Sequence, residues 1–347
     1  MKEVEFSFIV PIYNTEIKYL EECIVSILNE KISSYEIILV NDGTENENLN
    51  INYEKYAQTK ENIRYFYQKN SGSAVARNLG LEKSLGKYII FVDSDDGLKE
   101  GVYKEIKDVV NNKEFDIYCF DYSIWNVDNE NLFSLKESKD LSDEKNDILS
   151  NIMYVPQKYD NYAFGAIWGK CFLKEFLIKN NIKFIPQLRK AQDRRFMLEC
   201  VNSATKILYC PIYMYKYRKN NDSICKRMNY KMIEYYCSFQ KEMNEYCEKN
   251  DINKECNKYL TYYIINELLL LTIFHIDNNK NFKTIKKEYY EIIEKFDFLK
   301  NIKLLNYNDF KGIKEKTKFF LFKKNLIALL KIYFILIQKK NNKTNFR

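Results

Sequence analysis

Three carboxylates stand within four positions of one another in the run VDSDDG, at Asp93, Asp95 and Asp96. The run follows an apolar stretch, residues 87–92, that has the pattern of a buried strand. Acids grouped in this way are costly without a counter-charge. A hard cation such as Mg²⁺ or Mn²⁺ would supply it, held by one or two carboxylates and by substrate phosphates. The alternative is a turn with a helix N-cap, where Asp and Gly are common.

A second polar cluster, NDGT at residues 41–44, follows another short apolar run, residues 36–40. Taken alone it is a turn signal, because Asn, Asp and Gly favour turns. Its functional interpretation makes the Asp42 carboxylate a hydrogen-bond acceptor for a base or ribose that lies over the edge of a sheet.

The segment SGSAVARNLG, residues 71–80, begins a predicted helix with small residues. A helix N-terminus favours phosphate, and Arg77 could add positive charge there. Close packing of the small residues against a sheet is the alternative. The spacings G-x-G-x-x-G and G-x-x-x-x-G-K-[ST] are absent, which excludes those two nucleotide-binding motifs.

Two later segments also carry residue types suited to chemistry. AQDRRF places Asp193 at the start of a helix predicted over residues 194–202, where a carboxylate is either an N-cap or a general base. YKYRKNNDSI places Arg218 and Ser223 on a predicted loop, where surface solubility is the alternative to substrate binding.

Secondary-structure elements must position these candidate residues. The first ~120 residues of the chain alternate strand and helix patterns. Parallel strands need crossover helices, so the alternation predicts an α/β fold with a doubly wound, mostly parallel sheet. Ligands of such sheets bind beyond the carboxyl ends of the strands, where the polar clusters fall. Strands are expected at 4–10, ended by Pro11, and at 36–40, 63–67 and 87–92, with helices at 17–27, 74–85 and 102–109.

The pattern changes twice further along the chain. Strands at 116–122 and 207–217, the second open to division at Pro211, and a partly irregular stretch at 130–147 are expected. A helical stretch within 166–180 and long helices at 230–249, 254–276 and 283–296 are also expected. We therefore predict one catalytic domain over residues 1–225, made of two halves, 1–115 and 116–225. A helical region, 226–347, follows.

The segment 319–337 is the most hydrophobic part of the chain. Lys324, Lys331 and Gln338 recur every seven residues and predict one narrow polar stripe on a helix. Its apolar runs are too short for a membrane span. A helix at 319–340 that lies on a membrane surface and a helix that caps the C-terminal bundle both remain open.

Composition excludes several classes of protein. A single His, His275 in an apolar stretch, excludes catalytic triads and multi-His metal sites. Nine cysteines without a C-x-x-C pair, behind an acidic N-terminus with no signal peptide, suggest reduced thiols and a cytoplasmic location. The net charge of +7 suits an anionic membrane surface or a phosphate-bearing substrate, and no run of charge suggests nucleic acid.

Taken together, the motifs resemble family 2 of the glycosyltransferases, which have the GT-A fold. The runs that carry the resemblance are FIVPIYN, IILVNDGT, YFYQKNSGSAVARNLGL and GKYIIFVDSDD, which cover nearly all of the first ~100 residues. It continues more weakly through IWGKCFLKEFL, AQDRRF and YKYRKNNDSI to about residue 225. The remaining ~120 residues carry no resemblance.

The resemblance implies a GT-A catalytic domain with a nucleotide-binding half, 1–115, and an acceptor half, 116–225. It also implies a nucleotide-sugar site at the carboxyl edge of the sheet. Asp42 would hold the uracil edge and Asp93 would approach the ribose. Arg77 would lie near the nucleotide and its phosphates, and Arg218 would close over the pyrophosphate. The other implied members are Pro11, Tyr13 and Asn14 at the border of the uridine pocket, Asn70 near the nucleotide, and Ser223 beside the pyrophosphate.

It also implies a metal ligand and a base. Asp95 would bind Mg²⁺ or Mn²⁺, with Asp96 as a neighbouring candidate, and Asp193 would be the general base. The family commonly has Glu before that Asp, whereas this sequence has Gln192, which puts in doubt whatever that Glu contributes.

The expected function is inverting transfer of a sugar from a nucleoside-diphosphate sugar, such as a UDP-sugar, to an acceptor hydroxyl. The acceptor would be a glycan or lipid-linked glycan in capsule, lipopolysaccharide or other surface-glycan synthesis, and the enzyme would work in the cytoplasm or at the inner face of the membrane. A catalytically silent nucleotide-sugar-binding protein and a sugar-phosphate nucleotidyltransferase are the alternatives. Aromatic candidates for stacking on acceptor sugars are Tyr154, Tyr159, Tyr162 and Trp168.

Overall fold

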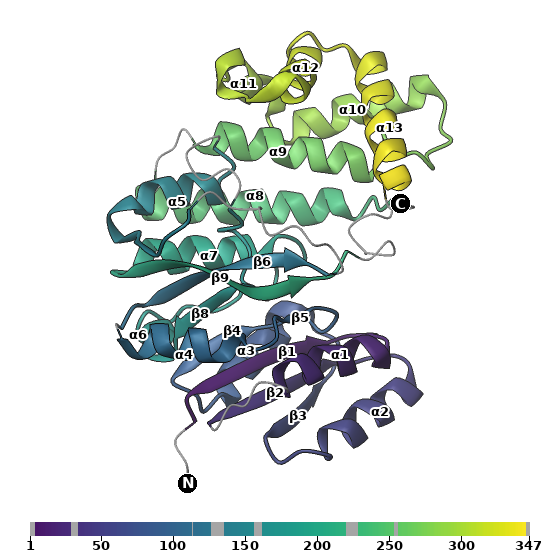
Figure 1. The fold of residues 1–347 in the computed structure, drawn as a ribbon. Helices are drawn as coiled ribbons and strands as arrows, with labels where there is room; N and C mark the ends of the chain where they lie inside the picture. Colours follow the sequence, from purple (N-terminus) through teal and green to yellow (C-terminus); the bar gives the residue numbers. More distant parts are fainter. Residues whose placement is uncertain are drawn as a thin grey trace. The chain divides into compact units, whose positions relative to one another are not determined.

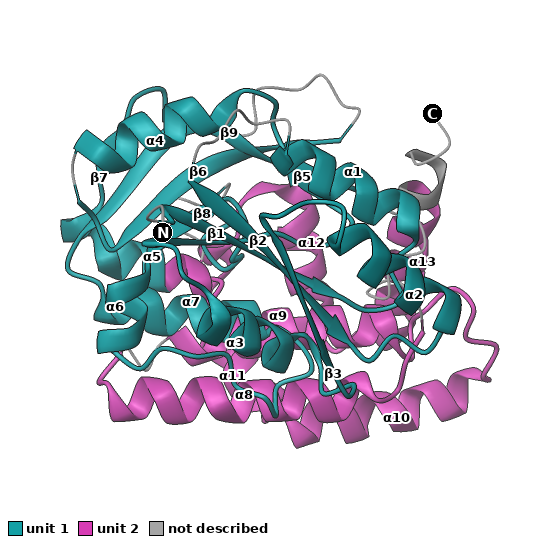
Figure 2. Cartoon of the chain, turned by 90° about the horizontal axis from the view of Figure 1, so that it is seen from below, with its two compact units in different colours: residues 1–149, 161–219 teal, residues 150–160, 220–347 magenta. Residues whose placement is uncertain are grey.

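The computed structural model describes residues 4–28, 34–112, 114–125, 135–155, 162–219, 228–252 and 256–344. The chain divides into two compact units, one of residues 1–149 and 161–219 and one of residues 150–160 and 220–347 (Figure 2). The sequence suggested a boundary at 225/226, which falls in the segment 220–227 outside the described residues.

The first unit is built on one mixed sheet, and the predicted α/β class is confirmed (Figure 1). In the described residues the strand order is β3-β2-β1-β4-β8-β6-β9-β5, with β7 beside β9. The pairs β1–β2, β1–β4, β2–β3 and β6–β9 are parallel and the others antiparallel. The strands are β1 (Phe6–Ile12), β2 (Tyr35–Asp42), β3 (Ile63–Gln68), β4 (Tyr88–Phe91), β5 (Gly97–Leu98), β6 (Ile117–Ile124), β7 (Lys139–Asp140), β8 (Lys170–Leu173) and β9 (Ile207–Tyr217).

Helices cross over between the parallel strands, as the alternating pattern requires. Helix α1 shows why the sequence folds so: its buried residues, Leu20, Cys23, Ile24 and Ile27, recur at the three- and four-residue spacing of one helix face. The helices that complete this part of the chain are α1 (Ile17–Leu28), α2 (Glu47–Ala57), α3 (Ser73–Lys83), α4 (Val102–Asn112), α5 (Lys145–Ile152), α6 (Lys174–Lys179) and α7 (Gln192–Ser203).

Two prolines were expected to limit strands, and the sheet accommodates both. Strand β1 continues through Pro11 to Ile12, because its ladder to β4 ends at Ile9 and a residue without an N–H is tolerated beyond it. In β9, Cys210 pairs with Phe120 and Tyr213 with Asp121, so Pro211 lies in a bulge and the strand is not split.

A helical stretch was expected within residues 166–180, and helix α6 lies there, but the strand that precedes it was not expected. The segment KCFL forms strand β8, antiparallel to β4 and β6, before helix α6 begins. All four residues of β8 are buried. A strand of this length that is buried on both faces shows no alternation, so its pattern does not differ from that of a buried helix segment.

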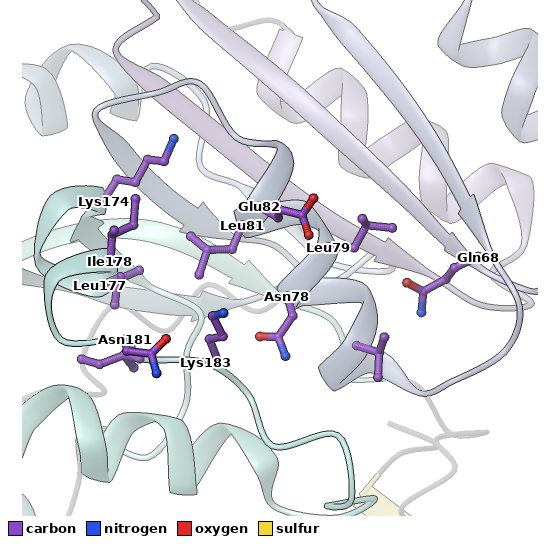
Figure 3. Close-up of a pocket in the computed structure, with 12 residues that line it drawn as sticks. Gln68, Asn78, Leu79, Leu81, Glu82, Lys174, Leu177, Ile178, Asn181 and Lys183 are labelled. Carbon is purple, nitrogen blue, oxygen red and sulfur yellow. The ribbon is translucent and has the colours of Figure 1, made fainter.

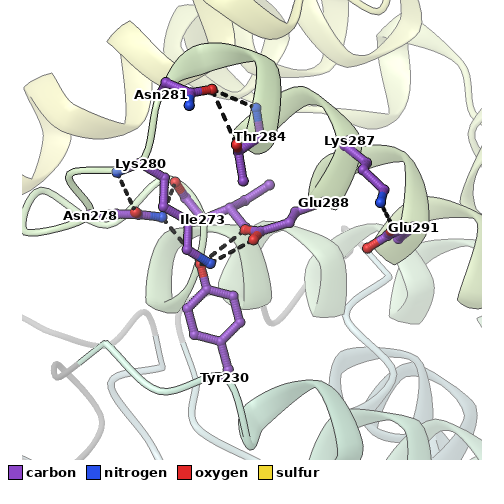
Figure 4. Close-up of polar contacts among 9 residues, drawn as sticks. All are labelled: Tyr230, Ile273, Asn278, Lys280, Asn281, Thr284, Lys287, Glu288 and Glu291. Carbon is purple, nitrogen blue, oxygen red and sulfur yellow. Dashed lines mark hydrogen bonds and ion pairs between the residues drawn. The ribbon is translucent and has the colours of Figure 1, made fainter.

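The second unit is helical in its described residues, as predicted. A polar cluster joins the start of its first helix to a later one (Figure 4). The Lys280 ammonium donates to the Tyr230 hydroxyl at 2.9 Å and to Glu288 at 2.5 Å, and the same hydroxyl donates to Glu288 at 3.0 Å. The helices are α8 (Met232–Lys249), α9 (Cys256–Leu271), α10 (Phe282–Lys295), α11 (Phe298–Lys303), α12 (Gly312–Lys323) and α13 (Ile327–Thr344).

The hydrophobic segment 319–337 is two helices, whereas the heptad spacing predicted one. Helix α12 ends at Lys323, Asn325 has a φ of 53°, and α13 begins at Ile327. The side chain of Gln338 donates to the Phe274 carbonyl oxygen at 3.0 Å and accepts from the Ile276 N–H at 2.9 Å, so it faces the interior of the unit. The three predicted polar residues therefore do not form one exposed stripe: Gln338 faces inward, whereas Lys324 is exposed before α13 begins. Within the described residues, every helix is too short or too polar to cross a membrane.

Close contact between α3 and β1 gives the first prediction. A Cβ added at Gly80 would lie 2.3 Å from Cγ2 of Ile9, which is wholly buried. Gly80→Ala should therefore lower the free energy of unfolding by about 1–3 kcal/mol, measured by urea titration. At an ordinary position inside a helix, the same change raises the free energy of unfolding by up to about 1 kcal/mol.

The control for this prediction removes the colliding atom. In an Ile9→Ala background, which lacks Cγ2, the Gly80→Ala change should be much less destabilising, so the two changes should not be additive. A stabilising Gly80→Ala in the otherwise unchanged chain would contradict the packing argument.

Candidate active site

The centre of the candidate site is a buried guanidinium between two carboxylates. Arg77, on α3, donates from one Nη to Asp93 at 2.8 Å and from the other to Asp193 at 2.9 Å. Its guanidinium carbon lies 5.5 Å from the ring centre of Phe184. Asp93 follows β4 and Asp193 lies in the first turn of α7, so one side chain joins three elements of the sheet unit.

Burial and charge act in opposite directions on these groups. Arg77 is 5% exposed, and burial alone would lower its pKa, but Asp193 and Asp93 outweigh burial and raise the pKa of the guanidinium. The enclosed surroundings of the Asp193 side chain, with Asp93 adding like charge, raise the pKa of Asp193, whereas Arg77 lowers it. Asp193 still keeps 30% of its side-chain surface accessible, as a proton acceptor for an incoming molecule must.

Asp42 organises the turn that begins α3. Its carboxylate accepts from the backbone N–H of Ser71 and of Gly72, each at 2.8 Å, and from the Gln68 amide at 2.7 Å. Gly43 has a φ of +68°, and a Cβ there would lie 2.4 Å from the backbone nitrogen of Asn70. The predicted Asp42 and Asn70 are therefore brought together at the end of β2.

The residues after β1 lie against the same loop. Asn14 has a φ of 50°, and its N–H donates to the Thr44 hydroxyl at 3.0 Å while its side-chain oxygen accepts from the Glu45 N–H at 3.1 Å. The Tyr13 hydroxyl donates to Glu45 at 3.2 Å, and its ring remains exposed. Pro11 is half-buried on β1. The ends of β1 and β2 thus form one polar edge.

The acids after β4 have distinct environments. Asp96 is 2% exposed and accepts from the Tyr215 hydroxyl at 2.7 Å and from the Arg218 N–H at 2.6 Å. Burial, with Asp93 adding to it, raises the pKa of Asp96 to about 8 against those hydrogen bonds. Asp95 is half-buried, and its carbonyl oxygen accepts from Nε of Arg218 at 2.7 Å.

Arg218 is held on several sides. Beyond its contact with Asp95, its Nη2 forms an ion pair with Glu22 at 2.6 Å, and its guanidinium carbon lies 3.9 Å from the Trp125 ring centre and 4.9 Å from that of Tyr19. The structure therefore brings Arg218 to the acidic run, as expected for a group near a diphosphate. Ser223 lies outside the described residues.

The donor set at this edge fits a cation that is held mainly by its substrate. The described part of the chain contains no group of three or more His, Cys, Asp or Glu side chains that could hold a metal ion. Asp93 is paired with Arg77, and Asp96 is enclosed by Tyr215 and Arg218. Asp95 is half-buried between them, and its role as a metal ligand stays a prediction.

The turn into α7 places the candidate base. Ala191 has a left-handed φ of 53°, and the helix begins at Gln192, one residue before Asp193. The Gln192 amide donates to the Ser73 hydroxyl at the start of α3. The residue that departs from the family's usual Glu therefore ties α7 to the helix that carries Arg77.

Sequence reasoning missed two residues of this site. Tyr215 accepts from the Asp93 N–H at 3.1 Å while donating to Asp96, and it stacks on Trp168 with ring centres 5.3 Å apart. Lys170 is 1% exposed and donates to the carbonyl oxygens of Ala163 at 2.9 Å and Trp168 at 3.4 Å. A lysine inside the apolar run IWGKCF was the available signal.

The aromatic candidates for acceptor binding have structural contacts. Tyr162 is buried and its hydroxyl donates to the Phe120 carbonyl oxygen at 2.9 Å. Trp168 is half-buried among Tyr122, Tyr215 and Tyr217. Tyr154 belongs to the helical unit, where it stacks on another tyrosine, and Tyr159 lies outside the described residues.

A pocket of about 560 Å³ lies elsewhere on this unit, along α3, α6 and the turn after α6 (Figure 3). Its lining combines apolar side chains such as Leu79 and Leu177 with Asn78 and Lys183. None of the predicted site residues lines it. Gln68, one of the lining residues, also donates to Asp42.

Comparison with known proteins gives the family. The model of glycosyl transferase family 2 matches residues 7–178, which include the polar edge and the acidic run. Glycosyltransferase GlyG of Streptococcus pneumoniae is 30% identical over 223 residues, which cover 63% of this chain and 72% of that protein. The chain belongs to glycosyl transferase family 2.

A further relative and a solved structure are also similar to this chain. The uncharacterized glycosyltransferase EpsJ of Bacillus subtilis is 29% identical over 218 residues, and this chain spans only 62% of its length. Among solved structures, residues 1–349 of S. aureus TarS in complex with UDP-GlcNAc match with a TM-score of 0.63 and 18% identity, over 98% of this chain and 92% of that one. This match confirms the predicted GT-A fold with its helical C-terminal region.

The buried Lys170 gives the second prediction. Burial lowers the pKa of its ammonium to about 8, although Cys119 and Asp193 oppose the shift. The unfolded chain, with an ordinary lysine pKa near ~10.4, then binds more protons than the folded chain between about pH 8 and 10. The free energy of unfolding should therefore rise with pH in this window by about 3 kcal/mol relative to Lys170→Met, measured by urea titration at each pH.

A companion variant separates charge from shape. Lys170→Arg keeps its charge throughout this pH range, so it should lack the rise just as the Met variant does. A wild-type stability that runs parallel to that of both variants from pH 8 to 10 would show that the ammonium is not desolvated.

Proposed function

We propose that this family 2 member transfers a hexose from a nucleoside-diphosphate sugar to an acceptor hydroxyl with inversion at the anomeric carbon. The observation that carries the proposal is the Arg77 bridge, which holds Asp93, after β4, and Asp193, at the start of α7, on one guanidinium. A donor-side acid and a candidate base are thereby fixed within the reach of one side chain. This spacing suits a displacement in which donor and acceptor meet directly.

The donor is proposed to be a UDP-sugar. The UDP-GlcNAc complex of the TarS neighbour supports this choice of nucleotide. In this chain, Asp42 with Tyr13 and Asn14 would receive the uridine, next to Asn70 and Pro11. Asp42 already accepts three hydrogen bonds, so it would bind the base with its remaining acceptor capacity and through the loop that it orders.

The proposed chemistry divides between the two sides of Arg77. Asp193 accepts the proton of the attacking hydroxyl, and its raised pKa brings it closer to neutral pH, where a general base works best. Arg218 lies beside the acidic run and stabilises negative charge that develops on the departing diphosphate, together with Ser223. A Mg²⁺ or Mn²⁺ ion held by Asp95 would supply further charge neutralisation when bound.

We propose an acceptor that is a glycan or lipid-linked glycan, in capsule, lipopolysaccharide or related surface-glycan synthesis. The bacterial glycosyltransferases among the relatives support this setting. The enzyme would act in the cytoplasm at the inner face of the membrane.

The assignment of the base gives the third prediction. Asp193→Asn removes the proton acceptor but keeps the shape of the side chain, so kcat should fall by about 10²–10⁴-fold. The Kd for a UDP-sugar, measured by calorimetry, should change little, because Asp193 is not among the proposed donor contacts. In the unchanged enzyme the acid limb of kcat/KM should lie above the ordinary carboxyl pKa of ~3.9, since the pKa of Asp193 is raised.

Asp143→Asn, a change at an exposed carboxylate of the same unit, is the matched control and should leave turnover intact. The substrates for the assay come from a screen of UDP-sugars for hydrolysis and thermal stabilisation. Near-normal turnover by Asp193→Asn would rule out this residue as the base. Donor binding without turnover in the unchanged enzyme, across acceptors, would favour the silent binding protein.

The metal assignment gives the fourth prediction. Chelation with EDTA should abolish donor hydrolysis, and Mn²⁺ or Mg²⁺ should restore it. Asp95→Asn should lower the activity by at least about 10²-fold, because one neutral amide oxygen replaces the carboxylate. The activity that remains in this variant should be insensitive to EDTA. Full activity of the unchanged enzyme in EDTA would exclude the metal without excluding the transfer reaction.

A further inference from the structure

Helix α13 has one apolar face that packs into the helical unit. Ile327, Leu330 and Phe334 are 5%, 0% and 3% exposed. Phe334 lies against Phe274 and Phe322, with ring centres 5.5 and 6.3 Å apart. This face accounts for the attachment of the helix to its own unit.

The same helix has a second apolar face that its own unit does not cover. Leu329, Ile332 and Leu336 are 50%, 54% and 61% exposed. With about 100° of rotation per residue, they fall on the side of the helix opposite to the packed face. Three large aliphatic side chains in one exposed row are more than scattered surface residues, and such rows mark contact surfaces.

The charge around this face identifies what it meets. Residues 312–340 contain eight lysines and one acidic residue, Glu315, a formal net charge of +7. The rest of the chain contains 47 basic and 47 acidic residues, so this stretch accounts for the whole excess of the protein. An exposed apolar row inside a basic stretch fits an anionic surface with an apolar interior.

We propose that the outward face of α13 lies on an anionic lipid bilayer. Leu329, Ile332 and Leu336 would enter the boundary between headgroups and acyl chains, a depth of about 5–10 Å for such helices. Lys324 before the helix and Lys339 after Leu336 would remain among the lipid phosphates. A second copy of the chain is a poorer occupant, because it would bring two segments of charge +7 together.

This proposal does not depend on the sugar-transfer chemistry, and its first test measures binding alone. The full chain is sedimented with vesicles of phosphatidylglycerol and phosphatidylcholine, and with phosphatidylcholine alone. It should bind the anionic vesicles, more weakly as salt rises. Leu329→Gln/Ile332→Gln/Leu336→Gln should bind them on the order of 100-fold more weakly, because the inserted apolar surface is lost.

The matched control changes equally exposed aliphatic residues of the sheet unit. Leu85 and Ile178 are 63% and 62% exposed, and Leu85→Gln/Ile178→Gln should bind vesicles as the unchanged chain does. If the triple variant keeps full binding, or if the control loses as much, the outward face of α13 is not the membrane surface. A dimer of the unchanged chain in sedimentation velocity that the triple variant abolishes would also overturn the proposal.

A charge variant tests the same surface without touching its apolar residues. Lys324→Gln/Lys339→Gln should weaken binding to anionic vesicles about 25-fold, at about fivefold for each lysine near the surface. Lys241→Gln/Lys287→Gln removes two exposed lysines of the same unit outside the basic stretch and should have little effect. Equal losses from both pairs would indicate general attraction and would overturn the assignment, even if the triple variant failed to fold.

Discussion

The structure of the sheet unit depends on one buried cation. The Arg77 guanidinium can be enclosed only because Asp93 and Asp193 neutralise it, and these residues come from segments 16 and 116 positions away along the chain. Without these two carboxylates the buried Arg77 charge would lack a counter-charge where water reaches it poorly. The Arg77 bridge therefore joins the end of β4 and the start of α7 to α3, and it couples the position of Asp193 to that of the acidic run.

The surrounding contacts extend this constraint to the whole carboxyl edge of the sheet. Tyr215, on β9, accepts from the Asp93 N–H and donates to Asp96, so a strand near the other end of the sheet holds the acidic run in place. On the other side, Asp42 orders the turn into α3 and thereby the position of Arg77. The carboxylates of this edge thus fall into two groups. Asp42 and Asp96 accept hydrogen bonds from backbone and hydroxyl groups, whereas Asp95 and Asp193 remain partly exposed.

The frame was predictable from the sequence because long amphipathic and apolar runs report burial directly, as α1 and β2 do. Short elements were not: β8 is four buried residues without a period, and Pro11 and Pro211 were tolerated through features of the ladder that only pairing reveals. In the candidate site, the motifs predicted which acidic residues lie together, but not which partner each of them contacts. Arg77 was expected at the phosphates, and its pairing with two distant carboxylates depends on tertiary contacts that no local pattern encodes.

The two units also differ in how their charged side chains are distributed. In the sheet unit the functional charges are paired or enclosed, and their pKa values are shifted by burial, as at Asp193 and Asp96. In the last two helices, eight lysines face one acid, and an apolar row stands exposed among them. Internal pairing produces a site that can develop and neutralise charge during a reaction. An excess of positive charge produces long-range attraction instead, which suits holding a protein at an anionic surface where its acceptor would be anchored.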